Sequence, residues 1–181
     1  MIQDNIKVTI LLATYNCEKF LRTQLDSIIY QTHTNWELIV SDDSSSDKTS
    51  DILNEYKLKY PEKIYILNNE KRFGNARDNF FHLLENCIGS YIMFCDHDDK
   101  WLPKKIELTL AKMLETEKKQ PPHTPVLVHT DLNVVDGELN MIAPSLMKFQ
   151  DISPERIKLN NLLVQNVITG CTVMINKELK E

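Results

Sequence analysis

Three carboxylates directly follow an apolar run that is typical of a buried strand. The run covers residues 91–95, and the acids are Asp96, Asp98 and Asp99. Because an ionised carboxylate is costly to bury unpaired, we expect the acids at the C-terminal end of the strand, where open α/β sheets bind ligands. One short loop can direct Asp96 and Asp98 toward the same point, and Mg²⁺ prefers carboxylate oxygens. The pattern predicts a divalent-metal site for a phosphorylated ligand; the alternative is a polar turn with solvated acids.

Polar side chains also end two earlier strand-like runs. Thr14, Tyr15 and Asn16 follow the first run, and Asp42 follows the second. A tyrosine can pack beside a planar base, and Asn or Asp can hydrogen-bond to a base or a ribose. The same residue types are also ordinary turn and capping residues. A calcium loop at 42–47 is a weaker alternative, because the segment lacks the Gly and the distal Glu of an EF-hand loop.

A third polar segment, residues 72–79, joins a strand-like run to a helical one. Arg72 can reach a base or a phosphate, Gly74 permits close backbone approach, and Asn75 lies where a helix N-terminus favours anions. The glycine-rich fingerprints of dinucleotide and P-loop sites are absent. Phosphate binding would therefore depend on a metal and on side chains. His97 and His129 fit a spacer and a strand end better than acid–base groups.

The elements that must position these groups alternate between strand and helix. Strand-like runs lie at 7–13, 36–40, 64–67 and 91–95, and each is followed by apolar residues at helical spacing. Such alternation predicts an α/β fold with a mostly parallel, Rossmann-like sheet, right-handed crossovers and helices on both faces. Asp47 or Ser46 is expected to cap the second helix. Gly89 is expected to end the third in a left-handed conformation.

The pattern changes after Pro125. We expect a strand at 126–129, a hairpin turn at Asp136-Gly137, a helix starting at Ser153-Pro154 and including Leu162 and Leu163, a strand at 167–175, and a helix from 177 capped by Asn176. A final helix of about one turn is unlike a natural terminus, so we expect a C-terminally truncated single domain, 1–181. Its halves would be a nucleotide-binding part, 1–118, and the start of an acceptor-side part, 123–181.

Composition excludes several classes of protein. The 181 residues are 42% hydrophobic and 26% charged with a net charge of −5, which does not suggest a nucleic-acid partner. Four scattered cysteines without a CxxC pair argue against zinc and indicate free thiols in a reducing compartment. No signal peptide or membrane-spanning run is visible. We therefore expect a cytoplasmic protein, with peripheral association at the inner face of the membrane left open.

Taken together, three motifs resemble those of family 2 glycosyltransferases of the GT-A fold. They are residues 13–16, 39–47 and 96–99, in the expected order and spacing. The segment 72–80, with 96–103 and 129–131, is most similar to the branch that includes rhamnosyltransferases of bacterial surface polysaccharides. The resemblance implies an inverting, metal-dependent transfer of a sugar from a nucleotide-diphosphate donor, a UDP- or dTDP-sugar, to a hydroxyl of a saccharide or lipid-linked acceptor.

The resemblance also implies roles for individual residues. On the nucleotide side, Thr14, Tyr15 and Asn16 would line the nucleotide, Asp42 would bind the base or ribose, and Arg72 and Asn75 would lie near the nucleotide. On the metal side, Asp96 would contact the ribose or the metal, Asp98 would be the principal ligand of Mn²⁺ or Mg²⁺, and Asp99 would support the loop. Residues 169–171 would lie near the sugar or acceptor. Members of the family place the catalytic base after the last strand found here, so we expect it beyond Glu181.

Three alternatives stay open. A nucleotide-sugar-binding module without turnover would fit a chain that lacks the base. A sugar-phosphate nucleotidylyltransferase would need a glycine-rich N-terminal loop, and residues 7–16 contain no glycine. A phosphatase with an aspartate nucleophile would carry Asp-x-Asp on its first strand, which here ends in Tyr15-Asn16.

Overall fold

A six-stranded sheet organises the chain in the computed structural model, which describes residues 5–162, 164 and 166–181. The strand order is β3-β2-β1-β4-β8-β5. The strands are β1 (Val8–Thr14), β2 (Trp36–Asp42), β3 (Ile64–Ile66), β4 (Tyr91–Cys95), β5 (Leu127–His129) and β8 (Val173–Asn176). Strands β1 to β4 run parallel, and β8 is antiparallel to both of its neighbours. The prediction of a mostly parallel α/β sheet is confirmed.

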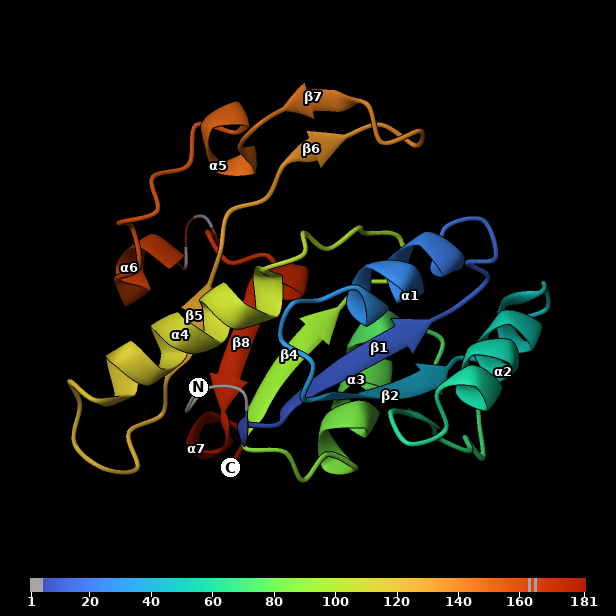
Figure 1. Cartoon of the computed structure of the whole chain (residues 1–181). Coiled ribbons are helices and arrows are strands. Elements are labelled where there is room, and N and C mark those ends of the chain that lie inside the picture. The colour runs from blue at the N-terminus through green and yellow to red at the C-terminus, as the bar shows by residue number, and fades with distance from the viewer. Residues whose placement is uncertain (1–4, 163, 165) are drawn as a thin grey trace.

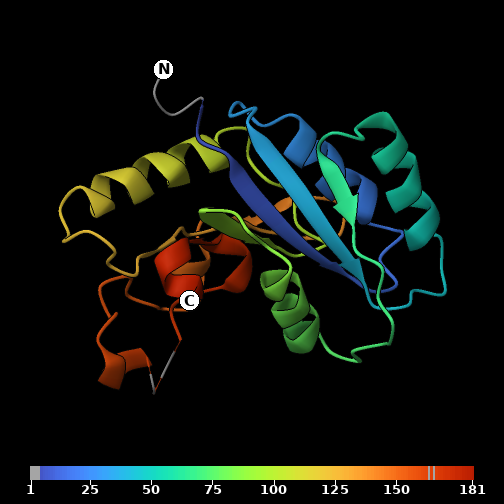
Figure 2. The ribbon, with the colours of Figure 1, turned by 90° about the horizontal axis from the view of Figure 1, so that it is seen from below.

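Helices cover both faces of this sheet, as predicted. The main helices are α1 (Leu21–Ile29), α2 (Thr49–Lys59), α3 (Ala76–Glu85) and α4 (Lys105–Glu117). Figures 1 and 2 show α1 and α4 on one side of the sheet and α3 on the other. The apolar residues of α2 belong to the same buried cluster as those of α1 and α4.

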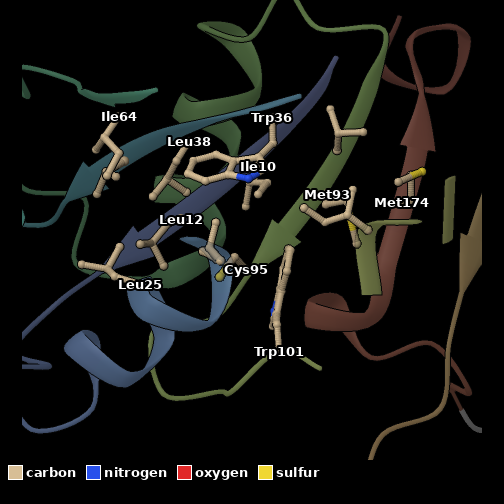
Figure 3. Close-up of a cluster of buried hydrophobic side chains, with 14 of the residues drawn as sticks. Ile10, Leu12, Leu25, Trp36, Leu38, Ile64, Met93, Cys95, Trp101 and Met174 are labelled. Carbon is tan, nitrogen blue, oxygen red and sulfur yellow. The ribbon is translucent and has the colours of Figure 1, made fainter. Parts of the chain in front are cut away.

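Strand β1 lies in the interior of the sheet, between β2 and β4, and all seven of its residues are therefore buried. Its side chains alternate between the two faces, so Ile10 and Leu12 join the cluster under α1, α2 and α4, whereas Leu11 joins the cluster under α3. Figure 3 shows the first cluster extending across the sheet from Ile64 to Met174. A strand buried on both faces reads as a continuous apolar run, which is why the sequence located it well.

The second half of the chain extends the same sheet through β5 and β8. Between them lie the predicted hairpin, β6 (Val134–Val135) with β7 (Met141–Ala143), and the short helices α5 (Leu146–Phe149) and α6 (Leu159–Leu162). In Figure 1 the hairpin and α5 lie beyond the C-terminal end of β4. The division into halves at 118–123 stays a prediction. No helix among the described residues is long and apolar enough to cross a membrane.

Two expectations for this half are wrong, and another falls partly outside the described residues. The capped helix begins after Ser145, whose Oγ accepts from Lys148 N at 3.0 Å, and not at Ser153. Residues 153–158 are all exposed, and a short helix without an apolar face to bury is not stable. Leu163 lies outside the described residues. The last strand begins only at Val173, because Gly170–Thr172 forms a 3₁₀ turn, labelled η2.

The side chain of Asn176 does not cap the final helix, α7 (Lys177–Lys180). It accepts from Val126 N at 2.9 Å and donates to Glu117 and to the carbonyl of Thr124. Asn176 therefore ties β8 to the connection between α4 and β5. At α2 the N-cap position is Lys48, which makes no side-chain cap bond, but the expected Asp47 lies one residue earlier and its Oδ1 accepts from Thr49 N at 2.9 Å.

Gly89 does not end α3 in a left-handed conformation. The helix ends at Glu85, and Gly74 is the described glycine with positive φ. Instead Gly89 packs against β1, where a Cβ added to it would lie 2.8 Å from Thr9 Cβ. Such overpacking of a buried site costs about 1–3 kcal/mol.

We therefore expect Gly89→Ala to lower the free energy of unfolding by about 1–3 kcal/mol, measured by urea denaturation. Gly137→Ala is the matched control, because the nearest atom to its added Cβ is the mobile Lys19 Nζ at 4.0 Å. Equal stability of Gly89→Ala and the unaltered protein would contradict the close-packing role.

Candidate functional site

The ends of the central strands bring the predicted polar residues to one edge of the sheet. Thr14 and Asp42 are register partners at the ends of β1 and β2, and Thr14 Oγ1 donates to Asp42 Oδ1 at 2.7 Å. Strand β4 lies on the other side of β1, with Cys95 opposite Leu12. The acids that follow β4 therefore emerge at the same edge.

Asp42 is held in a fixed orientation by its neighbours. Besides the Thr14 hydroxyl, Ser45 donates to it twice, from its amide at 3.0 Å and from its hydroxyl at 2.6 Å. The carboxylate is only partly buried, so it remains open to a ligand. Hydrogen bonds of this kind orient an acceptor before a ligand arrives, which reduces the ordering cost of binding.

Asn16 has a structural role that the sequence analysis did not assign. Its backbone has φ 45°, its amide donates to Ser45 Oγ at 2.9 Å, and its Oδ1 accepts from Ser46 N at 2.8 Å. The Asn16 side-chain oxygen thus joins the loop after β1 to the loop after β2. Its predicted contact with a base or ribose is not tested by this geometry.

Tyr15 and Arg72 lie together, although they are far apart in the sequence. The guanidinium carbon of Arg72 is 4.5 Å from the Tyr15 ring centroid, within the range of a cation–π contact. Both side chains are exposed. The pair forms a flat, cationic surface beside Asp42.

Asp43 is a site residue that the sequence analysis missed. It is buried, and its carboxylate accepts from the amides of Phe73 and Gly74, the second at 2.8 Å. Arg72 Nε lies 3.9 Å from the same carboxylate. Asp43 therefore holds the loop that carries Arg72. The sequence did contain a signal for this role, namely the adjacent acids Asp42 and Asp43. Neighbouring residues at a strand end face opposite sides, so only one of the two could face the ligand and the other had to have a different partner.

The loop at 72–75 corrects the expectation for Gly74 and gives Asn75 a further role. Gly74 has φ 77° and open space around its missing side chain, so its requirement is the left-handed backbone rather than close approach. Asn75 caps α3: its Oδ1 accepts from Asp78 N at 2.9 Å, and its Nδ2 donates to Asp78 Oδ2. The structure thus gives Asn75 a capping role, and its predicted role in nucleotide binding stays untested.

Two asparagine side chains that were not singled out fix the end of β2, the partly buried Asn69 and the buried Asn79. Asn69 Nδ2 donates to Ser41 Oγ at 2.9 Å and to the Asp42 carbonyl at 2.7 Å, and Asn79 Nδ2 donates to the Ser41 carbonyl at 3.0 Å. Asparagine is a common loop residue, so neither carried a distinguishing signal in the sequence.

The acid loop after β4 meets the Gly170–Thr172 turn. Ligand atoms of Asp96, Asp99 and Cys171 lie within 4.8 Å of one another; we call these three residues the acid cluster. Burial raises the pKa of Asp96, and the carboxylates of Asp99 and Asp98 raise it further. Burial also raises the pKa of the Cys171 thiol, with added contributions from Asp99 and Asp96. Negative charge is therefore concentrated where a cation would relieve it.

The structure thus groups Asp99 rather than Asp98 with Asp96. Asp98 is exposed, whereas Asp96 and Asp99 are partly buried. The prediction of a metal ligand at Asp98 is not tested by this geometry, since an exposed carboxylate is free to turn toward a ligand. All four cysteines are free and buried, as expected.

An apolar hollow of about 290 Å³ opens beside the acid loop. Asp96 and Gly170 lie at it, and its walls come mainly from α3 and the sheet: Arg77, Phe80, Phe81, Leu84, Phe94 and Val173. The Phe80 and Phe94 rings pack edge to face with centroids 5.7 Å apart. Carboxylate and apolar surface therefore meet at this edge.

Comparison with known proteins places this geometry in a family context. The model of the family described as "Glycosyl transferase family 2" matches residues 9–172. The chain is 30% identical over 179 residues to the Escherichia coli protein named UDP-Glc:alpha-D-GlcNAc-diphosphoundecaprenol beta-1,3-glucosyltransferase WfgD. That alignment covers 97% of this chain and 62% of the relative.

Another relative has the higher identity over a shorter span. The dTDP-rhamnosyl transferase RfbG of Shigella flexneri is 43% identical over 101 residues, which covers 53% of this chain and 34% of that protein. Among solved structures, the mannosyltransferase PcManGT of Pyrobaculum calidifontis, in complex with GDP-Man and Mn²⁺, has a TM-score of 0.62. It is 18% identical and covers 97% of this chain and 46% of its own. This likeness confirms the GT-A fold.

Proposed function

The chain belongs to glycosyl transferase family 2, and we propose that it binds a nucleotide-diphosphate sugar and serves the transfer of that sugar to an acceptor hydroxyl. The transfer would be inverting and metal-dependent, in the assembly of a bacterial surface polysaccharide at the cytoplasmic face of the membrane. Because the chain spans 62% of the relative from Escherichia coli, the activity of the whole protein is part of the proposal.

The observation that carries this proposal is the meeting of two different surfaces at one sheet edge. One is the Tyr15–Arg72 pair with Asp42, which suits a planar base and its N–H groups. The other is the acid loop, which suits a cation and a diphosphate. A nucleoside diphosphate has these two ends. In this arrangement Thr14 orients Asp42, and Arg72 lies over the base-binding side.

The donor atoms of the acid loop fit a divalent cation. Carboxylate oxygens are the preferred ligands of Mg²⁺ and also suit Mn²⁺. We assign Asp96 and Asp98 as its protein ligands, because Asp98 is exposed and free to turn toward a cation, whereas Asp99 is partly buried. A bound cation would stabilise charge on the departing diphosphate as a Lewis acid.

We assign no catalytic base within the described residues. Asp131 is the acid at the end of β5, but its carboxylate accepts from Ser145 Oγ and from the amides of Leu132 and Met147. Burial opposes its ionisation, yet these hydrogen bonds lower its pKa overall. A carboxylate used in this way is a weak base, so Asp131 is a poor candidate for the catalytic base. Donor binding without turnover is the alternative for this chain.

The donor and acceptor follow from chemistry that the relatives share. Uracil and thymine both present an N3–H that a carboxylate such as Asp42 can accept, so a UDP- or dTDP-sugar fits. The two relatives are named for UDP-glucose and for dTDP-rhamnose. One of them is named for a diphosphoundecaprenol-linked acceptor, which supports a lipid-linked or saccharide acceptor here.

The test is a calorimetric titration of UDP and dTDP into the protein, with Mn²⁺ and with a chelator in its place. We expect Mn²⁺ to tighten the binding of these diphosphates strongly, and the tighter nucleotide identifies the donor class. Absence of binding by either nucleotide to folded protein with Mn²⁺ present would overturn the proposal.

Asp42→Ala tests the base-binding half of the site separately. Losing a hydrogen bond to a charged group costs about 1.5–3 kcal/mol, so we expect UMP to bind at least about 10-fold more weakly in the absence of metal. Asp51→Ala, which removes an exposed acid on α2, should leave binding unchanged. An effect of Asp42→Ala that appears only with Mn²⁺ would move Asp42 to the metal side.

A further inference from the structure

Lys105 lies against the acid loop and has no part in the function proposed above. It is the first residue of α4, and unlike the exposed Lys104 before it, its side chain turns into the protein. Its Nζ donates to the carbonyl oxygen of Cys171 at 2.9 Å and lies 4.8 Å from the Trp101 ring centroid. The side chain is partly buried, and lysines taken out of water usually have a polar partner.

The segment from which Lys105 extends is firmly anchored. Three hydrogen bonds tie it to α1 and to Gln31 just after that helix: Trp101 N to Ser27 Oγ at 3.0 Å, Gln31 Nε2 to the Leu102 carbonyl at 2.8 Å, and Ile106 N to Gln31 Oε1 at 3.1 Å. In Figure 3 the Trp101 ring lies in the core beside Cys95. Lys105 therefore begins from a fixed point.

The turn that receives this hydrogen bond has one backbone bond to another element, from Thr130 N to the Thr172 carbonyl at 3.3 Å. Thr172 donates to the Thr169 carbonyl through its amide at 2.9 Å and through its hydroxyl at 2.6 Å, and both bonds lie within the turn. The bond from Lys105 Nζ comes from another element. It acts on Cys171, whose thiol belongs to the acid cluster.

Charge favours the same arrangement. Burial lowers the pKa of Lys105, while Cys171, Cys95, Asp99 and Asp96 favour its charged form. A cation beside two close carboxylates offsets their mutual repulsion. Removing the Lys105 side chain would therefore loosen the turn and leave the repulsion between Asp96 and Asp99 without a nearby positive charge.

We propose that Lys105 is a positioning residue, which holds the Gly170–Thr172 turn against the acid loop and so fixes the acid cluster for the metal and diphosphate. The tether itself stands on the contacts above. Its consequence for ligand binding rests on the proposed function.

The tether is tested without any ligand, by alkylating the native protein with iodoacetamide and measuring each cysteine by peptide mass spectrometry. All four thiols are buried. We expect Lys105→Met to speed labelling of Cys171 at least 10-fold, with Cys17 and Cys87 changed less than twofold. Lys104→Met is the matched control and should leave all rates unchanged, and Lys105→Arg should keep Cys171 protected.

Two outcomes overturn the tether. One is an unchanged rate at Cys171 in Lys105→Met, and the other is a uniform rise at all four cysteines, which would show general loosening. Lys105→Gln, which is neutral but still polar, is measured in the same way, so that poor folding of Lys105→Met does not decide the result.

The consequence for binding is tested by titrating UDP or dTDP into the same variants. With Mn²⁺ we expect Lys105→Met to bind at least 10-fold more weakly, while UMP binding without metal changes less than twofold. Equal losses in both conditions would overturn the positioning role. An unaltered protein that binds neither nucleotide would overturn the proposed function alone, and the labelling result would still decide the tether.

Discussion

Asp98→Asn is expected to weaken Mn²⁺-dependent binding of the nucleoside diphosphate at least about 100-fold, or about 2.7 kcal/mol, without changing the stability of the fold. The substitution keeps the size of the side chain and removes the charge that a hard cation requires. Asp98 is exposed, so the core loses nothing. The measurements are calorimetric titration of UDP or dTDP with Mn²⁺, and urea denaturation.

Asp99→Asn is the matched variant, because it makes the same change at the next residue. Asp99 lies with Asp96 and Cys171 inside the acid cluster, where it supports the loop. We expect its loss to reduce metal-dependent binding by a smaller factor than the loss of Asp98. The reverse order, with Asp99→Asn abolishing binding and Asp98→Asn retaining it, would make Asp99 the principal ligand and refute the assignment made here.

The contrast between these two acids shows where prediction from sequence stops. The apolar run before Asp96 located a strand end correctly, because burial on both faces leaves a continuous pattern. Which carboxylate then faces Cys171 depends on the path of a short loop and on a turn about 70 residues away in the sequence. No periodic pattern records such a contact, so spacing alone favoured Asp98 and Asp96 as a pair.

The glycines show the same limit at the level of the backbone. Gly89 and Gly74 both follow polar segments, and the sequence favoured a left-handed conformation at the first and close packing at the second. The structure reverses them: Gly74 has φ 77°, whereas Gly89 packs against Thr9. A glycine indicates that something is special about its position, but the reason depends on its tertiary neighbours.

The elements of the first half were predictable because each buries a periodic apolar face against the same sheet. The segment between the hairpin and the last strand was not, since residues 153–158 are exposed and offer no such face. Ser153-Pro154 has the local chemistry of a helix start, yet the cap forms at Ser145, where α5 follows. Local signals decide a short helix only when packing supports them.

The buried Asp43 offers the other large effect. Its carboxylate accepts the amides of Phe73 and Gly74, and leaving partly buried donors unsatisfied costs about 1–3 kcal/mol. We expect Asp43→Ala to lower the free energy of unfolding by about 2–4 kcal/mol, since two charge-assisted bonds are lost. Urea denaturation measures this loss. Glu70→Gln, which neutralises an exposed acid just before the same loop, should change stability by less than about 0.5 kcal/mol.

The same variant should also affect the ligand, because Asp43 fixes the loop that places Arg72 over Tyr15. Under conditions where Asp43→Ala remains folded, UMP is expected to bind at least about 10-fold more weakly. Asp43→Asn keeps one acceptor oxygen, so its stability and its affinity for UMP should fall between those of Asp43→Ala and of the unaltered protein. Since Asp43 lies behind the loop, its effect on UMP should vanish in an Arg72→Ala background. Additive losses in the double variant would show that Asp43 acts on the nucleotide by another route.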